Sequence, residues 1–136
     1  MTTVTAEYLG DLRVSCTHTA SGANIITDAP VDNHGKGQAF SPTDLCSTSL
    51  AACAMTIMGI FAQEHGLDVT GTTIEVTKIM GENPRRISEI QVIYNMPDKG
   101  YTDKNKKSLE RAAHTCPVRL TLDKDVQQNI SFNWAR

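Results

Sequence analysis

The feature that most constrains this fold is a run of 18 residues without a charged side chain, which extends from Leu45 to Ala62. Its sequence, LCSTSLAACAMTIMGIFA, would leave a helix apolar or small on every side. A helix without a polar face is either buried all round or crosses a membrane. Four hydroxyl residues interrupt the run, and its length only reaches the minimum for a bilayer, about 18 residues. We therefore expect the buried central helix of a soluble protein.

Residues on both sides of this run mark the ends of the helix. Ser41 can act as the N-cap, Pro42 suits the first helical position, and Asp44 can complete a capping box. Gly66 suits the C-terminal cap. The helix then has about 24 residues and is roughly 36 Å long. One chain of 136 residues has little material to enclose such a helix, so we expect a second copy to cover it in a homodimer.

The other predicted elements are strands and one further helix. Alternating or β-prone residues predict three strands with tight turns before the long helix and a hairpin after it. An amphipathic helix, with Thr102 as its N-cap, and a last strand follow. The ranges are strands 2–8, 12–19 and 23–28, an irregular loop 29–41, strands 69–80 and 87–96, a helix 102–115 and a strand 126–134. The order βββ-α-ββ-α-β predicts one domain, residues 1–136, of the α+β class with mostly antiparallel pairing.

Net charge and cysteine content exclude several classes of function for this chain. A net charge of −2 without a basic cluster argues against a nucleic-acid partner, and no Arg-rich amphipathic face suggests membrane binding. The first residues lack the features of a signal peptide, so we expect a reducing, cytoplasmic location with free thiols. No C-x-x-C or paired histidine spacing predicts a metal site. Core packing or redox chemistry then remain for the four cysteines, which are Cys16, Cys46, Cys53 and Cys116.

Two of these cysteines have settings that suit chemistry. Cys53 lies mid-helix among alanines, which leaves room for a reactant to approach its sulfur. Cys116 precedes Pro117, and if Pro117 begins a helical turn, the positive end of that turn favours the Cys116 thiolate. Cys46 is seven residues, roughly 10.5 Å, from Cys53 along the helix, too far for a disulfide. Core packing stays open for each cysteine, and Cys16 is predicted to be structural.

The two cysteine segments resemble a known family. FSPTDLCSTSLAACA is similar to the central-helix motif of the OsmC/Ohr family of peroxide-handling proteins, and AAHTCPV is similar to its second cysteine motif. The cysteines lie 63 positions apart, as in that family, and the order of elements matches along essentially the whole chain. The resemblance implies an OsmC-like fold, an intertwined homodimer whose long central helices are wrapped by sheets, and reduction of organic hydroperoxides.

The resemblance also assigns roles. It implies that Cys53 is the peroxidatic cysteine and Cys116 the resolving one, with a dithiol reductant such as a lipoylated protein and with no metal, flavin or haem. A mid-helix thiol in apolar surroundings needs a nearby cation to become a thiolate. The family supplies an arginine from the N-terminal hairpin, and Arg13 is its best match in this chain.

One position departs from the peroxidase branch of the family. A glutamate that holds the arginine follows the helix-start proline in that branch, and Thr43 stands there in this chain. Asp44 is a candidate substitute, although neighbouring helix positions point about 100° apart and capping competes for its carboxylate. Two other functions therefore stay open: a non-catalytic module that binds a hydrophobic small molecule, and a thiol redox sensor.

Overall fold

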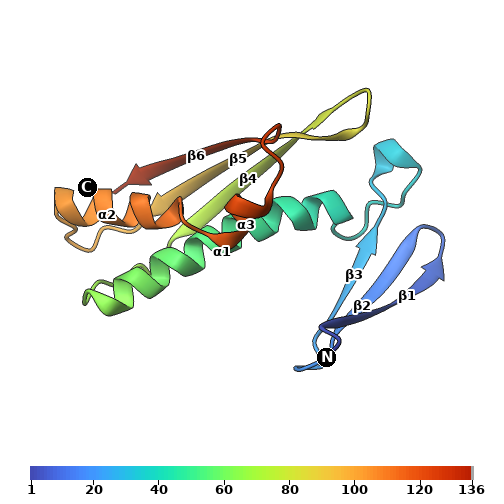
Figure 1. Cartoon of the computed structure of the whole chain (residues 1–136), viewed down its shortest axis with the longest axis horizontal. Coiled ribbons are helices and arrows are strands. Elements are labelled where there is room, and N and C mark those ends of the chain that lie inside the picture. Colours follow the sequence, from blue (N-terminus) through green and yellow to red (C-terminus); the bar gives the residue numbers. More distant parts are fainter. Residues whose placement is uncertain (136) are drawn as a thin grey trace. The chain divides into compact units, whose positions relative to one another are not determined.

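The computed structural model describes residues 1–135 and divides the chain into two compact units, Met1–Cys46 and Ser47–Arg136 (Figure 1). The predicted α+β order is confirmed, with one short helix added after the second long one. The elements are β1 (Val4–Gly10), β2 (Arg13–His18), β3 (Asn24–Asp28), η1 (Val31–Asn33), α1 (Pro42–Glu64), β4 (Thr73–Gly81), β5 (Arg86–Met96), α2 (Asp103–Ala113), α3 (Pro117–Thr121) and β6 (Gln127–Trp134). Assignment of the whole chain to a single domain stays a prediction.

The N-terminal unit contains an antiparallel meander of β1, β2 and β3 in that order. The β1–β2 turn is tight, because Gly10 has a φ of 86° and the two residues after it are also left-handed. In the β2–β3 register, Arg13 at the start of β2 lies directly opposite Asp28 at the end of β3. Directly opposed residues share one face of a sheet, so the register brings these two side chains together.

The irregular loop predicted for residues 29–41 folds back on this end of the sheet. The amide of Asp28 donates to the Phe40 carbonyl at 3.1 Å, and the amide of Gly37 donates to the Ala29 carbonyl at 3.3 Å. A Cβ at Gly35 would clash with the Ala29 backbone, so the close approach requires glycine there. The loop thereby returns to the residues that end β3.

Helix α1 begins with the predicted capping box. The Ser41 amide donates to Asp44 Oδ2 at 2.9 Å, and the Asp44 amide donates to Ser41 Oγ at 3.0 Å. The helix ends at Glu64, and Gly66 follows with a φ of 67°, as a C-terminal cap requires. Among residues 1–135, α1 is the one helix that is long and apolar enough to cross a membrane by length and composition alone.

In the single chain, α1 is buried along one face only, and burial of its other side by a second copy stays a prediction. Its buried residues lie along one face, and the exposed positions Ala52, Thr56 and Ile60 follow a spacing of four along another. The core cluster that the buried face of α1 joins contains residues of β4, β5 and β6, so this sheet covers that face. The buried residues are Ser47, Leu50, Ala51, Ala54, Met58 and Ala62.

The C-terminal unit has a second three-stranded sheet with β5 at its centre. Strands β4 and β5 form the predicted antiparallel hairpin, whereas β5 and β6 are parallel. A parallel neighbour needs a crossover, and α2 and α3 provide it between β5 and β6. The alternation of β5 is confirmed, because one face of it is fully or almost fully buried. The residues of that face are Ile90, Val92, Tyr94 and Met96.

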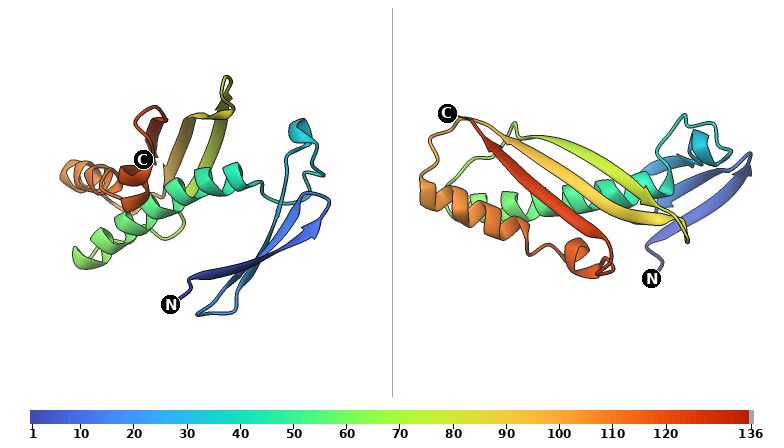
Figure 2. Two further views of the ribbon diagram at one scale, coloured as in Figure 1. Left: turned by 45° about the vertical axis from the view of Figure 1, so that its right-hand side comes forward. Right: turned by 90° about the horizontal axis from the view of Figure 1, so that it is seen from above.

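Helices α1 and α2 lie on the same face of this sheet, as the views in Figures 1 and 2 agree. Thr102 caps α2 as predicted, in a capping box with Asn105 whose two hydrogen bonds measure 3.0 and 3.1 Å. Leu109 and Ala113 of α2 are fully buried and join the core cluster that α1 and β5 form. The core of the C-terminal unit therefore consists of side chains that pack between β5 and the two long helices.

Candidate active site

Cys53 lies in the middle of α1, beside the core of the C-terminal unit. Its side chain is half-buried and packs against the core cluster, as a free thiol. The next residue, Ala54, is fully buried, whereas Ala52 before it is exposed. Cys53 therefore stands at the border of the buried face of α1, where its sulfur combines an apolar setting with access for a reactant.

Cys116 lies at the N-cap of α3, as predicted from the proline that follows it. Pro117 takes the first helical position, and the amide of Arg119 donates to Cys116 Sγ at 3.3 Å. The residue is fully buried. Its sulfur is thus a capping acceptor in the core, placed there by the turn between α2 and α3.

The structure brings the two predicted cysteines together. The side chains of Cys53 and Cys116 lie close enough for Cys53 to act on the pKa of Cys116, although 63 positions separate them in the sequence. Burial raises the pKa of the Cys116 thiol, the Arg119 amide acts in the opposite direction, and Cys53 raises it further. The helix end does favour the Cys116 thiolate, as predicted, but desolvation outweighs the hydrogen bonds from the amides, so the net effect is a raised pKa. Cys116 keeps its proton and can donate it to Cys53.

Tyr94 of β5 belongs to the same site, and sequence reasoning gave it only a core position. Its hydroxyl donates to the Ala51 carbonyl of α1 at 2.8 Å, and its ring stacks on Phe132 with centroids 5.3 Å apart. Burial raises the pKa of Tyr94, and Cys116 and Cys53 add to the rise. Its phenol thus stays neutral beside both sulfurs. The sequence signal that could have pointed to Tyr94 is a tyrosine on a buried strand face, because a buried tyrosine hydroxyl needs a hydrogen-bond partner.

Arg13 lies in the N-terminal unit and is held by a carboxylate that the sequence did not single out. Arg13 Nε donates to Asp28 Oδ1 at 2.7 Å, and Nη2 donates to Oδ2 at 2.9 Å. The hydrogen bond from Arg13 holds the pKa of Asp28 below its usual value. Asp44 uses its carboxylate in the capping box of α1. Pairing of Arg13 with Asp44, and an action of Arg13 on Cys53, stay predictions.

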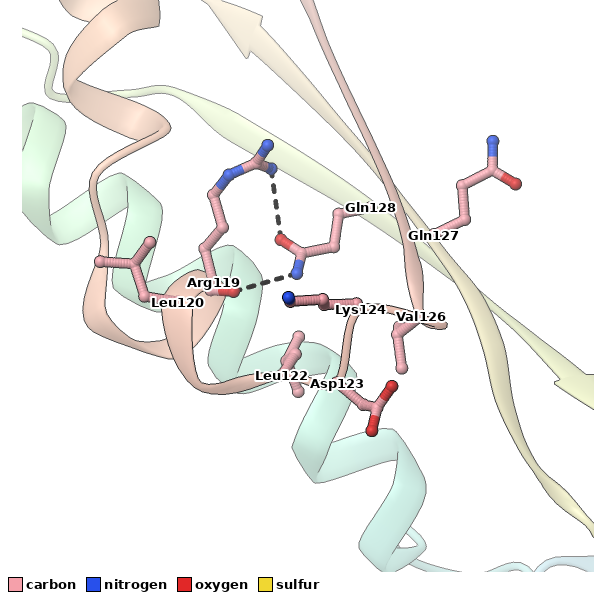
Figure 3. Close-up of a pocket in the computed structure, with 8 residues that line it drawn as sticks. All are labelled: Arg119, Leu120, Leu122, Asp123, Lys124, Val126, Gln127 and Gln128. Carbon is pink, nitrogen blue, oxygen red and sulfur yellow. Dashed lines mark hydrogen bonds between the residues drawn. The ribbon is translucent and has the colours of Figure 1, made fainter.

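A cavity of about 470 Å³ lies beside α3 (Figure 3). Gln128 forms part of one wall and makes two hydrogen bonds with Arg119. Its side-chain oxygen accepts from the Arg119 guanidinium at 3.2 Å, and its side-chain nitrogen donates to the Arg119 carbonyl at 3.1 Å. The amide of the same arginine donates to Cys116 Sγ, so the wall of the cavity connects to the buried thiol. The lining residues are Arg119, Leu120, Leu122, Asp123, Lys124, Val126, Gln127 and Gln128.

The remaining cysteines lie away from the sulfur pair in the chain. Cys46 is half-buried in the first turns of α1, and Cys16 is half-buried in the middle of β2. Both are free thiols. Within residues 1–135, no three His, Cys, Asp or Glu side chains gather closely enough to hold a metal ion.

Comparison with known proteins places this site in a family. The family described as OsmC-like protein matches residues 35–131. A solved structure from Psychrobacter arcticus 273-4, provisionally named an osmotic stress induced and detoxification response protein, is 48% identical. That match covers 98% of this chain and 96% of the other, with a TM-score of 0.93. No protein of curated function matches the chain.

Two more distant structures share the fold. The organic hydroperoxide resistance protein OsmC of Legionella pneumophila is 17% identical, with 98% of each chain covered and a TM-score of 0.74. An organic hydroperoxide resistance protein of Elizabethkingia anophelis is 16% identical, with 99% of this chain and 98% of the other covered and a TM-score of 0.75. At these identities the likeness shows the fold alone.

Proposed function

Because the chain belongs to the OsmC-like protein family, we propose that it reduces organic hydroperoxides with the thiols of Cys53 and Cys116. The contact between these two sulfurs is the observation that carries the proposal. Two distant relatives of the same fold are named for organic hydroperoxide resistance, which supports this substrate class. No metal or organic cofactor is needed for the thiol chemistry.

The first step takes place at Cys53. Its thiolate attacks the terminal oxygen of the hydroperoxide, a sulfur–oxygen bond forms and the oxygen–oxygen bond breaks. The alkoxide leaves and takes up a proton to become an alcohol, so the peroxide is reduced and Cys53 is oxidised to a sulfenic acid. The border position of Cys53 supports this role, because the reacting sulfur needs both access and an apolar setting.

The second step uses Cys116. Its sulfur attacks the sulfenic sulfur of Cys53, a disulfide forms, and the hydroxyl leaves with the Cys116 proton as water. The raised pKa of Cys116 supports this order of events, because the group stays protonated until the sulfenic acid exists. An external dithiol, such as a lipoylated protein, then reduces the disulfide by thiol–disulfide exchange and is itself oxidised to a disulfide.

Arg13 is the proposed cation for this chemistry. A guanidinium stays charged at any working pH, so it can stabilise the Cys53 thiolate and the developing alkoxide. Its bidentate bond to Asp28 supports the role, because a fixed cation needs no reorganisation during the reaction.

The working protein is proposed to be a cytoplasmic homodimer. The exposed face of α1, with Ile60 at 48% exposure, is uncharged from Leu45 to Ala62 and would be covered by a second copy. Sedimentation equilibrium tests this, with an expected mass of twice the 14.8 kDa of the chain. A species with the mass of one chain at micromolar concentration would contradict it.

The activity is tested with purified protein, cumene hydroperoxide and dihydrolipoamide. We expect peroxide consumption that requires the dithiol, and complete loss of turnover in Cys53→Ser. The matched control is Cys46→Ser, which changes a cysteine on the same helix and should keep the activity. Full turnover in Cys53→Ser would defeat the proposal.

A second candidate function is a non-catalytic module for a hydrophobic small molecule. Thr43 favours it, because the peroxidase branch of the family has a glutamate there, whereas this chain resembles the general OsmC-like branch. Thiol titration separates the two functions. If Cys53 reacts with iodoacetamide at neutral pH no faster than a free cysteine, the binding module is favoured over the peroxidase.

A further inference from the structure

We propose that Gln128 of β6 is the positioning residue that holds α3, and with it Cys116, beside Cys53, and that it thereby sets how fast the Cys53 sulfenic acid is captured. This inference rests on the proposed function, and it adds a residue that neither the sequence nor the family resemblance connected with the site. Gln128 acts through Arg119, to which it is bonded, and not on the reacting sulfurs themselves.

Helix α3 follows Cys116 directly, but it contains little that could hold it in place by itself. It has five residues, Pro117–Thr121, and none of these five is buried. Leu120 is 75% exposed, while Val118 and Leu122 pack against the core cluster and are only partly buried. A single helical turn is marginal in water, because its first hydrogen bond requires several dihedral angles to be fixed. The position of α3 therefore depends on contacts with other elements.

Gln128 makes two such contacts, both with one residue of this turn (Figure 3). Its side-chain nitrogen donates to the Arg119 carbonyl at 3.1 Å, and its side-chain oxygen accepts from Arg119 Nη1 at 3.2 Å. The first bond fixes the backbone of α3, and the second fixes the arginine side chain. The Arg119 amide in turn donates to Cys116 Sγ at 3.3 Å. A single residue thus links Gln128 to the buried sulfur.

The two partner groups on Arg119 select a side-chain amide at position 128. A guanidinium offers only hydrogen-bond donors and a backbone carbonyl only accepts, so the side chain between them must present one acceptor and one donor. Glutamine has both, whereas an ionised glutamate only accepts and leucine offers neither. The contact therefore depends on the chemistry of Gln128 and not on its size alone.

Gln128 is itself fixed by the sheet that carries it. Strand β6 pairs in parallel with the central strand β5, where Gln128 lies opposite the fully buried Ile90. Exposure alternates along β6, so that Gln127 is exposed and Gln128 is half-buried. Ile90 and Cys116 belong to the core cluster against which Cys53 packs. A bond from β6 to α3 therefore fixes Cys116 relative to Cys53.

The fate of the Cys53 sulfenic acid depends on how Cys116 is held. Cys116 captures it by forming the disulfide and releasing water, whereas a second hydroperoxide adds an oxygen to the same sulfur and leaves as an alcohol. The second reaction gives a sulfinic acid, which a dithiol does not reduce. A thiol that is held in place reacts much faster than a mobile one. Loss of the Gln128 contacts should therefore slow capture and increase overoxidation.

The test follows Cys53 in the full-length protein by quenched mass spectrometry after rapid mixing with cumene hydroperoxide. In Gln128→Leu, which removes both hydrogen bonds, we expect unchanged formation of the sulfenic acid and about 10- to 100-fold slower formation of the disulfide. Excess hydroperoxide should give more sulfinic acid. Gln128→Glu keeps an acceptor for the guanidinium and should lie between the two proteins. The matched control is Gln127→Leu, at the neighbouring exposed position of β6 on the same cavity, which should change neither rate.

A second variant identifies the path of the effect. Arg119→Ala removes the guanidinium bond but keeps the carbonyl and the amide, so it should slow disulfide formation less than Gln128→Leu. Combined with Gln128→Leu, it should add nothing. If Gln128→Leu fails to fold, unchanged disulfide rates in both Gln128→Glu and Arg119→Ala would overturn the inference. A lower melting temperature of Gln128→Leu with unchanged disulfide and sulfinic acid formation would also overturn it, because Gln128 would then be only structural.

Failure of the proposed function gives a different result. Diamide adds to one thiol, and the second thiol displaces it as a hydrazine that carries both thiol hydrogens, so the closing step reports how Cys53 and Cys116 are held without a hydroperoxide. If Cys53→Ser keeps full turnover with hydroperoxide, the peroxidase proposal fails, while the diamide reaction still decides the role of Gln128. Slower closure in Gln128→Leu would support the inference, and equal closure would overturn it.

Discussion

The two units of the chain prepare their functional groups in different ways. In the N-terminal unit, a hairpin register joins Arg13 and Asp28, which are 15 positions apart. In the C-terminal unit, Cys53 and Cys116 are 63 positions apart and meet only because α1, β5 and the crossover share one core. The cation is therefore prepared by local pairing, and the thiol pair by tertiary packing.

The two units also differ in how deeply the residues of their strands are buried. Six of the seven β1 residues are exposed, whereas the inward face of β5 is buried. Exposed apolar residues of the N-terminal unit include Tyr8 at 62% and Ile25 at 49%. A change in the C-terminal core should therefore alter stability and thiol chemistry together, while a change at the exposed positions of the N-terminal sheet should cost little stability.

The largest expected effect comes from breaking the sulfur pair. In Cys116→Ser, the disulfide cannot form, but hydroperoxide should still oxidise Cys53 to a sulfenic acid, which dimedone traps and mass spectrometry detects. Turnover with a dithiol should fall sharply. Cys16→Ser, in β2, is the control and should keep the Cys53–Cys116 disulfide. Failure to trap any sulfenic acid would argue that Cys53 is not the first sulfur to react.

The next effect tests the packing that joins the sulfurs. Leu109→Ala removes a fully buried side chain from α2 and should lower the free energy of unfolding by about 2–5 kcal/mol, because a cavity remains. Val4→Ala changes an apolar residue of β1 that is 49% exposed, and should cost less than about 0.5 kcal/mol. Denaturant unfolding measures both. Equal losses would remove the distinction between the two units.

A smaller effect should come from Tyr94→Phe. The change removes the hydrogen bond to the Ala51 carbonyl and should cost about 1 kcal/mol of stability, because α1 loses a contact with β5 near Cys53. Disulfide formation should slow while sulfenic acid formation at Cys53 continues, which stopped-flow and quenched mass analysis separate. Phe132→Leu, which alters the stacked ring but keeps this hydrogen bond, is the control. An unchanged rate of disulfide formation would exclude Tyr94 from positioning the sulfurs.

The smallest effect is a pH dependence of stability. The pKa of Cys116 is raised above its ordinary value of 9.0, so the folded state holds a proton that the unfolded state releases first. This stabilisation is complete below about pH 9 and is lost as the pH rises toward the pKa of the folded state. Urea unfolding between pH 8 and 10 should show a steeper loss for the native chain than for Cys116→Ala. Identical slopes would show that the thiol is not desolvated.

Local signals in the sequence predicted much of this fold. The capping residues Ser41, Asp44 and Thr102 have the expected partners within three positions, because capping depends only on neighbouring residues. The alternation in β5 predicted its buried face, and Pro117 predicted the turn that Cys116 caps. These features need no knowledge of distant contacts.

The missed features all depend on tertiary structure. Asp28 is found only from the register of β2 with β3, and Tyr94 only from the packing of β5 on α1. The raised pKa of Cys116 follows from burial that no local motif reports. The resemblance singled out Cys53 and Cys116, and the packing explains how these two sulfurs come to lie together.

The central claim is that the two distant sulfurs form one redox pair, and the mass of the protein after one equivalent of cumene hydroperoxide tests it most directly. The account predicts a loss of two hydrogens that maps to a single cross-linked peptide pair containing Cys53 and Cys116. A gain of oxygen without that cross-link, or a disulfide that uses Cys46 in place of Cys116, would contradict it.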